Sequence, residues 1–143
     1  MKFHFDENMY GSWRRAAGGG QEGRFDFTCR AEADSLRRFL ADRTTRLTGT
    51  VTMEGVVEGV PFEGTLKIDP ILGHELVYDF TFKAGKSMYR FLGRKNVDFK
   101  RPVWTMTHMV GQVEKDGMTF ANVDSHFDLK ELPKLVLSVR PGL

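Results

Sequence analysis

The sequence has little cysteine. Cys29 is the single cysteine in 143 residues, so no intramolecular disulfide can form and no set of thiolates can hold zinc or an iron–sulfur cluster. Chains without disulfides are typical of reducing compartments, and we therefore expect a cytoplasmic protein. Because Cys29 alternates with Phe25 and Phe27, we interpret it as a small side chain of the core rather than as a nucleophile.

The chain also lacks an excess of charge of one sign and long apolar runs. Its 21 basic and 19 acidic side chains leave a net charge of +2. The electrostatic field of so small a charge is too weak to predict nucleic acid as a partner. Short basic clusters at 13–15, 94–95 and 100–101 are expected to lie on the solvated surface. No stretch approaches the ~18 to 20 apolar residues that span a bilayer, and the first residues do not read as a signal peptide. We expect no transmembrane segment.

Recognisable catalytic motifs are missing as well. The four histidines (His4, His74, His108 and His126) do not stand at metal-ligand spacing, so no metal site is predicted. The serines carry no nucleophile-elbow glycines, and the glycine-rich segment 18–20 lacks the Lys-Ser/Thr ending of a phosphate loop. We therefore predict no catalytic residue and no cofactor.

What the sequence does contain is a repeated alternation of apolar and polar residues, the pattern of strands with one buried face. The predicted strands are 3–13, 25–29, 47–53, 62–68, 76–82, 88–97, 103–113, 118–123 and 135–139. Turn residues separate these runs at 58–61, 69–73, 84–86 and 115–117, and Asp116-Gly117 is the strongest two-residue hairpin signal. Consecutive strands joined by short turns predict an antiparallel meander.

The fold class predicted is mainly β. About eight or nine strands are enough to form a closed or nearly closed barrel, which removes the exposed edges of a long open sheet. Two short helices are predicted at 33–40 and 128–132 from helical spacing and capping residues. The length and the 41% hydrophobic content are those of one ordinary domain, which we place over 1–143.

Aromatic and soft side chains indicate where a ligand could bind. Segment 103–113 combines Trp104, Thr105 and His108, and we predict these residues as ligand-binding, together with Tyr78 and Tyr89. Faces rich in Thr, His and Tyr on 47–56 and 103–113 suit the wall of a cavity that hydrogen-bonds one end of an apolar guest. The alternative is a packed core whose outer face is rich in threonine.

Six short segments match another kind of domain in order and spacing. They are 5–11 (FDENMYG), 36–42 (LRRFLAD) with 47–51 (LTGTV), 62–66 (FEGTL), 88–91 (MYRF) and 103–107 (VWTMT). In these segments the chain resembles the accessory β-domain that accompanies bacterial cholesterol-oxidase-type members of the glucose–methanol–choline oxidoreductases. The resemblance implies a β architecture and a neighbourhood of lipid- or sterol-like substrates. It does not imply oxidoreductase activity, because the Gly-x-Gly-x-x-Gly turn that binds flavin is missing.

Two functions therefore stay open at this point. The first is a non-catalytic accessory barrel that binds a hydrophobic, lipid- or sterol-like small molecule or docks onto an oxidoreductase or another protein partner. The second is a cofactor-free isomerase or cyclase in which His108, with Tyr89 or Asp79, moves a proton on an apolar substrate. Because exposed edge strands of a sheet can pair with another chain, we also expect a homodimer or a partner complex.

Overall fold

The computed structural model describes residues 2–33, 41, 43–69, 75–96, 108–126 and 140–142. These residues form nine β-strands, numbered in chain order. They are β1 (Lys2–Arg15), β2 (Glu22–Ala33), β3 (Thr44–Met53), β4 (Val57–Asp69), β5 (Glu75–Ala84), β6 (Ser87–Asn96), β7 (His108–Lys115), β8 (Met118–His126) and β9 (Arg140–Gly142).

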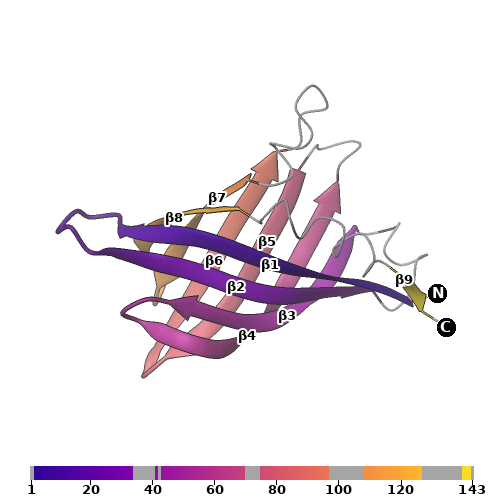
Figure 1. Ribbon diagram of the computed structural model, residues 1–143, viewed down its shortest axis with the longest axis horizontal. Helices are drawn as coiled ribbons and strands as arrows, with labels where there is room; N and C mark the ends of the chain where they lie inside the picture. Colours follow the sequence, from indigo (N-terminus) through magenta and orange to yellow (C-terminus); the bar gives the residue numbers. More distant parts are fainter. Residues whose placement is uncertain are drawn as a thin grey trace.

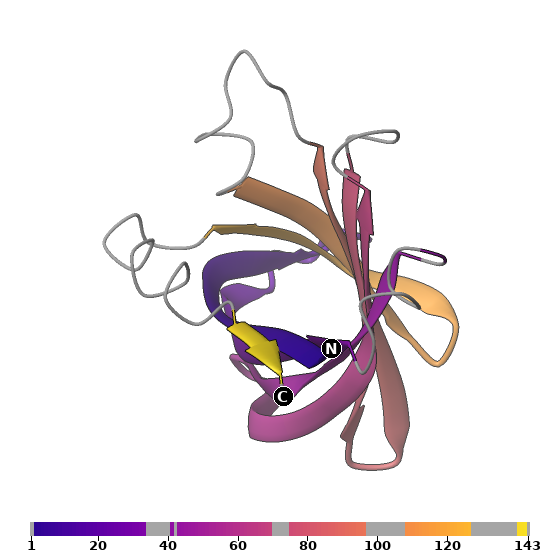
Figure 2. The same cartoon turned by 90° about the vertical axis from the view of Figure 1, so that its right-hand side faces the viewer.

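Eight of these strands form a closed antiparallel barrel (Figures 1 and 2). The strands β2 to β8 follow one another as a meander, and β1 closes the sheet by pairing with β8 and with β2. The short β9 pairs with the first residues of β1. The predicted barrel is thus confirmed. The predicted helix at 128–132 lies outside the described residues, as does the one at 33–40 except for Ala33, which ends β2.

The two ends of the barrel differ in how they connect the strands. At one end, here called the hairpin end, tight connections at 16–21, 54–56, 85–86 and 116–117 join the strands in pairs. At the other end, here called the loop end, the strands are joined through 34–43, 70–74, 97–107 and 127–139. Within the described residues, no helix is long and apolar enough to cross a membrane.

The turns show where local sequence was a good guide. Asp116 and Gly117 both have positive φ, 49° and 87°, which is the conformation of the tight hairpin predicted there. The turn predicted at 58–61 is wrong, because these residues belong to β4. The reversal comes earlier, at Gly55 with φ 86°, and the register between β3 and β4 shifts beside Gly59. Glycine there serves a bulge rather than a turn.

The core follows from the alternation of the strands, since every second side chain points inward. Its centre is a cluster of aromatic rings in which Phe80 contacts Phe62, Phe27 and Phe91 at centroid separations of 3.8, 5.3 and 5.0 Å. Each aromatic pair of this kind contributes about 0.5–1.5 kcal/mol beyond the burial of its area. Cys29, 5% exposed, belongs to the same core, as predicted.

Two glycines allow neighbouring strands to approach closely. A Cβ atom on Gly49 would lie 1.9 Å from the carbonyl oxygen of Thr28, and one on Gly64 would lie 1.9 Å from that of Asp79. Both positions are inside strands, where a missing side chain is typical of a sharply bent barrel sheet. Closure of the barrel therefore depends on glycine at these positions.

Candidate functional site

The inward side chains of β2 become smaller from the hairpin end to the loop end. On β2, the hairpin half contributes the large rings of Phe25 and Phe27, whereas the loop half contributes Cys29, Ala31 and Ala33. All five side chains are buried. The loop half of β2 thus presents small side chains to the interior, which is where a barrel of this size can accept a guest.

The same half of the interior contains a polar cluster formed by Glu7, Tyr78 and Lys95. The Lys95 ammonium donates to Glu7 Oε1 at 3.2 Å, to Glu7 Oε2 at 3.3 Å and to the Tyr78 hydroxyl at 3.0 Å. The Tyr78 hydroxyl donates in turn to Glu7 Oε1 at 2.7 Å. These side chains come from β1, β5 and β6, so only the closed barrel brings them together. We call them the Glu7–Tyr78–Lys95 cluster.

The cluster is shielded from water. The side chains of Lys95 and Glu7 are 1% and 5% exposed, and Tyr78 is 1% exposed. A buried ion pair gives little net stability, because desolvation of two charges offsets their attraction, and apolar residues of similar volume often serve the fold as well. Six other ion pairs of the described residues lie on the outer surface, where each is worth about 1 kcal/mol or less. Net stability alone therefore does not account for the inner pair.

Burial keeps the Tyr78 hydroxyl of the cluster and the nearby Cys29 thiol protonated. Burial, and then the negative charge of Glu7, raise the pKa of Tyr78 well above its ordinary value. Burial is also the main cause that raises the pKa of Cys29, with Glu7 adding to it. At neutral pH the Tyr78 hydroxyl is consequently a hydrogen-bond donor rather than a base, and the Cys29 thiol is not a nucleophile.

Ser125 adds an unpaired group to the same region. Its side chain is fully buried, and its Oγ has no hydrogen-bond partner among the described residues. Ser125 pairs with Met109 on β7, and Val110 pairs with Arg94, the residue before Lys95. The inward side chains of Lys95, Met109 and Ser125 therefore follow one row across β6, β7 and β8. Buried hydroxyls in native proteins nearly always have a partner, so this one is unusual.

The structure separates the residues that the sequence analysis grouped as ligand-binding. Tyr78 lies in the polar cluster, but Tyr89 lies at the hairpin end, where its ring contacts Phe82 and Phe120. His108 begins β7 and alternates with the buried Met109, which places it on the outer face. Trp104 and Thr105 lie outside the described residues. Among Tyr78, Tyr89 and His108, no two are brought together.

The proton-moving group considered above is likewise dispersed. Asp79 alternates with the buried Tyr78 and Phe80, and both of its carboxylate oxygens accept hydrogen bonds from Arg90 on the outer surface. The threonine-rich face of β3 also points outward: Thr50 is exposed and its hydroxyl lies 3.2 Å from that of Thr28. For this strand, the packed core with a threonine-rich outer face is the correct alternative.

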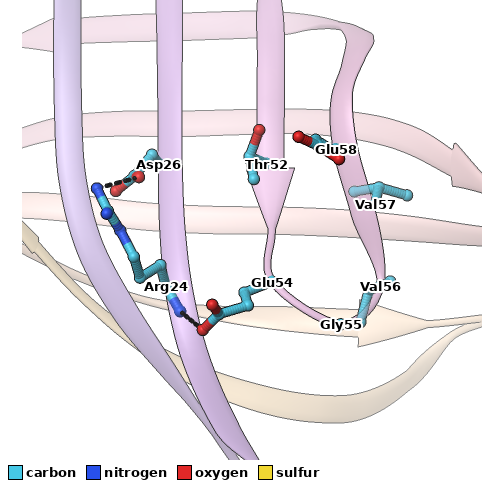
Figure 3. A pocket seen from close by; sticks show the side chains of 8 residues that line it. All are labelled: Arg24, Asp26, Thr52, Glu54, Gly55, Val56, Val57 and Glu58. Atoms are coloured by element: carbon cyan, nitrogen blue, oxygen red, sulfur yellow. Dashed lines mark hydrogen bonds and ion pairs between the residues drawn. The ribbon is translucent and has the colours of Figure 1, made fainter.

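Two surface grooves lie near the hairpin end. The first, of about 620 Å³, is shown in Figure 3 and is lined mainly by polar side chains of β2 and of the β3–β4 hairpin. There Asp26 accepts a hydrogen bond from the Arg24 guanidinium, and Glu54 accepts one from the Arg24 backbone N–H. The second groove, of about 800 Å³, is lined by Trp13, Tyr89 and Phe120 among others. The rings of Trp13 and Tyr89 are only 5% exposed, so this groove offers little apolar surface.

The outer face also carries a pair of histidines. His108 and His126 are partners across β7 and β8, with ring centroids 6.0 Å apart. Within the described ranges, no group of three or more His, Cys, Asp or Glu side chains is placed to hold a metal ion. Two imidazoles alone do not make the three- or four-ligand site that a bound zinc ion requires.

Comparison of the chain with protein-family models, with curated protein sequences and with solved structures gives no match. The resemblance to the accessory β-domain consequently stays an interpretation of six sequence segments. The function has to be argued from the geometry of the barrel.

Sequence reasoning missed three of the residues that define the polar region, namely Glu7, Lys95 and Ser125. The expectation that the basic cluster at 94–95 is solvated is wrong for Lys95, which is 1% exposed. A signal was present, because Lys95 continues the alternation of Tyr89 and Phe91 along β6 and is therefore in phase with the buried residues. A charged residue at an inward position of a predicted strand is the pattern that should have drawn attention.

Proposed function

We propose that this protein is a non-catalytic binding barrel that takes a lipid- or sterol-like small molecule into its loop end. The observation that carries the proposal is the Glu7–Tyr78–Lys95 cluster, a charged and hydrogen-bonded group buried inside an otherwise apolar barrel. Ligand sites are mostly apolar with a few fixed polar groups that orient the guest, and barrel mouths are common places for them. The cluster would hold the polar end of the ligand.

The distribution of side-chain size supports the same end of the barrel. Rings fill the hairpin half, where Phe25, Phe80 and Phe91 are fully buried. In the loop half, β2 and β8 place the small Ala31, Ala33 and Ser125 on inward positions, whereas β3, β4 and β5 place leucines there (Leu47, Leu66 and Leu76). An apolar guest would make contacts in the space beside these small side chains. Every CH₂ group that it buries would contribute about 0.8 kcal/mol.

The alternative function, a cofactor-free enzyme that moves a proton, has less support. His108 and Asp79 face outward and Tyr89 lies at the other end of the barrel. Tyr78 is well placed inside the barrel, but its raised pKa makes it a donor and a poor general base near pH 7. Binding without chemistry is the function that this arrangement favours.

The test uses two fluorescent probes with the same tetraene chain, cis-parinaric acid and parinaryl alcohol, and native mass spectrometry of the protein purified from its own host. We expect saturable one-to-one binding of at least one probe. Ala33→Phe places a large ring in the loop half and should weaken that binding by about tenfold or more, equivalent to about 1.4 kcal/mol. Phe120→Leu, at the hairpin-end groove, is the matched control and should bind normally.

Two results would overturn the proposal. The first is the absence of binding by both probes together with a native mass that carries no small molecule. The second is loss of binding in Phe120→Leu with normal binding in Ala33→Phe, which would move the site to the hairpin end. Circular dichroism and the melting temperature of each variant show whether the barrel is intact, so that a folding defect is not read as a binding defect.

A further inference from the structure

The hydrogen bonds of the polar cluster restrict the kind of head group that it can accept. An ammonium group has three N–H donors, and those of Lys95 are directed to Glu7 Oε1, Glu7 Oε2 and the Tyr78 hydroxyl. The single proton of the Tyr78 hydroxyl is directed to Glu7 Oε1. Among the described residues, the donors of the cluster are thus directed within it, and the charges of Glu7 and Lys95 oppose each other.

Acceptor capacity remains on one atom of the cluster. A carboxylate offers about four lone-pair sites on its two oxygens. Oε1 of Glu7 accepts from both Tyr78 and Lys95, but among the described residues Oε2 accepts only from Lys95. The region can therefore receive one more hydrogen bond from a guest at Glu7 Oε2.

Ser125 supplies the complementary group. Its Oγ is buried and has no partner within the described part of the chain, and its hydroxyl can donate one hydrogen bond and accept another. Ser125 is two strands from Lys95 along one inward row, and neighbouring strands lie about 4.8 Å apart. The Ser125 hydroxyl is therefore a second inward polar group in the same half of the barrel, and a guest bound there could give it a hydrogen-bond partner.

The remaining acceptor site on Glu7 Oε2 and the Ser125 hydroxyl, unpartnered within the described residues, discriminate among three kinds of ligand head group. A carboxylate would need Lys95 to leave Glu7, and two anions would then share one buried cation. An ammonium group would add an unbalanced positive charge to a neutral cluster. A hydroxyl brings no charge, and it can donate a hydrogen bond to an acceptor such as Glu7 Oε2 or accept one from a donor such as Ser125. Building on the proposed function, we infer that the ligand of this barrel is a neutral apolar alcohol rather than a fatty acid.

The matched probes test the inference directly, because cis-parinaric acid and parinaryl alcohol differ only in the head group. At pH 8, where the acid is ionised, the alcohol should bind about tenfold or more tightly than the acid. Ser125→Ala should weaken binding of the alcohol by about tenfold, the usual effect of one lost hydrogen bond in a buried site, and leave the acid unchanged. Ser12→Ala changes an exposed serine on β1 and is the control.

A second readout concerns the protein without a probe. Because the Ser125 hydroxyl has no partner among the described residues, Ser125→Ala should melt at the wild-type temperature or above it. A clear drop in the melting temperature would mean that the hydroxyl serves the fold, and this would overturn the inference.

The binding results separate failure of the inference from failure of the proposed function. Tighter binding of the acid, lost in Lys95→Met/Glu7→Gln, overturns the alcohol but keeps the loop-end site. Equal binding of both probes, unchanged in Ser125→Ala, also overturns it. If neither probe binds and no small molecule co-purifies, the proposed function itself is wrong. Preference for the alcohol together with its dependence on Ser125 supports both.

Discussion

Removal of one charge from the polar cluster should destabilise the barrel more than removal of the whole cluster. Lys95→Met keeps a long unbranched side chain but leaves the Glu7 carboxylate, 5% exposed, with Tyr78 as its remaining side-chain donor among the described residues. Loss of one partner from a buried ion pair costs about 3–5 kcal/mol. A domain of this kind has a free energy of unfolding of about 5–15 kcal/mol, so this one substitution should remove about a fifth of it or more.

Further substitutions in the cluster should then restore stability. In Glu7→Met/Lys95→Met the cluster no longer contains a charge. The remaining cost, about 1–3 kcal/mol, is that of the Tyr78 hydroxyl, which has lost its acceptor. Addition of Tyr78→Phe removes this cost as well. The triple variant should return to about the wild-type stability, because apolar replacement of a buried ion pair is often neutral or stabilising.

Urea unfolding, followed by circular dichroism and by tryptophan fluorescence, to which the buried Trp13 contributes, gives the free energy and the m-value of each variant. Lys83→Met, on the exposed face of β5, is the control and should change stability by no more than about 0.5 kcal/mol. The reasoning is refuted if Lys95→Met costs less than about 1 kcal/mol, since the charge left behind would then not be buried. It is also refuted if the double variant is less stable than Lys95→Met.

Two more predictions concern the same barrel. Burial raises the pKa of Tyr78 and of Cys29 above their ordinary values of 10.0 and 9.0. When the pH exceeds these ordinary values, the unfolded chain binds fewer protons than the folded barrel. The free energy of unfolding should therefore fall as pH rises in this range. Tyr78→Phe and Cys29→Ala should make the melting temperature less sensitive to pH above 9, and an unchanged slope would contradict the assignment. Gly64→Ala would place a Cβ atom 1.9 Å from the carbonyl oxygen of Asp79 and should cost at least about 1–3 kcal/mol in urea unfolding, whereas the neighbouring exposed Thr65→Ala should not.

The strands were predictable because each inward face must be apolar, and a period of two needs no knowledge of the rest of the chain. Alternation about Phe80 on β5 and about Val51 on β3 therefore predicts both strands correctly. The hairpin at Asp116-Gly117 was also predictable from local sequence, because the positive φ at both positions depends only on these residues. Gly59 was misread because glycine serves a bulge as well as a turn, and only the pairing of β3 with β4 separates the two.

The candidate site was less predictable. The prediction of Tyr78 rested on residue type alone, and the sequence analysis grouped it with Tyr89 and His108, which lie at other parts of the barrel. Residue types suited to ligand binding occur on both faces of a strand, and their grouping along the chain does not place them together in space. Trp104 and Thr105 stay predictions, since they lie outside the described residues.

The sequence by itself determined the class of the fold: a β meander with one dominant inward pattern, one buried cysteine and turns set by local backbone chemistry. Only the tertiary structure decided which charges meet. Glu7 and Lys95 are 88 residues apart in the chain, and Tyr78 is 71 residues from Glu7. Their hydrogen bonds exist because β1 closes the barrel opposite β5 and β6, and no local pattern encodes a contact that depends on closure of the sheet.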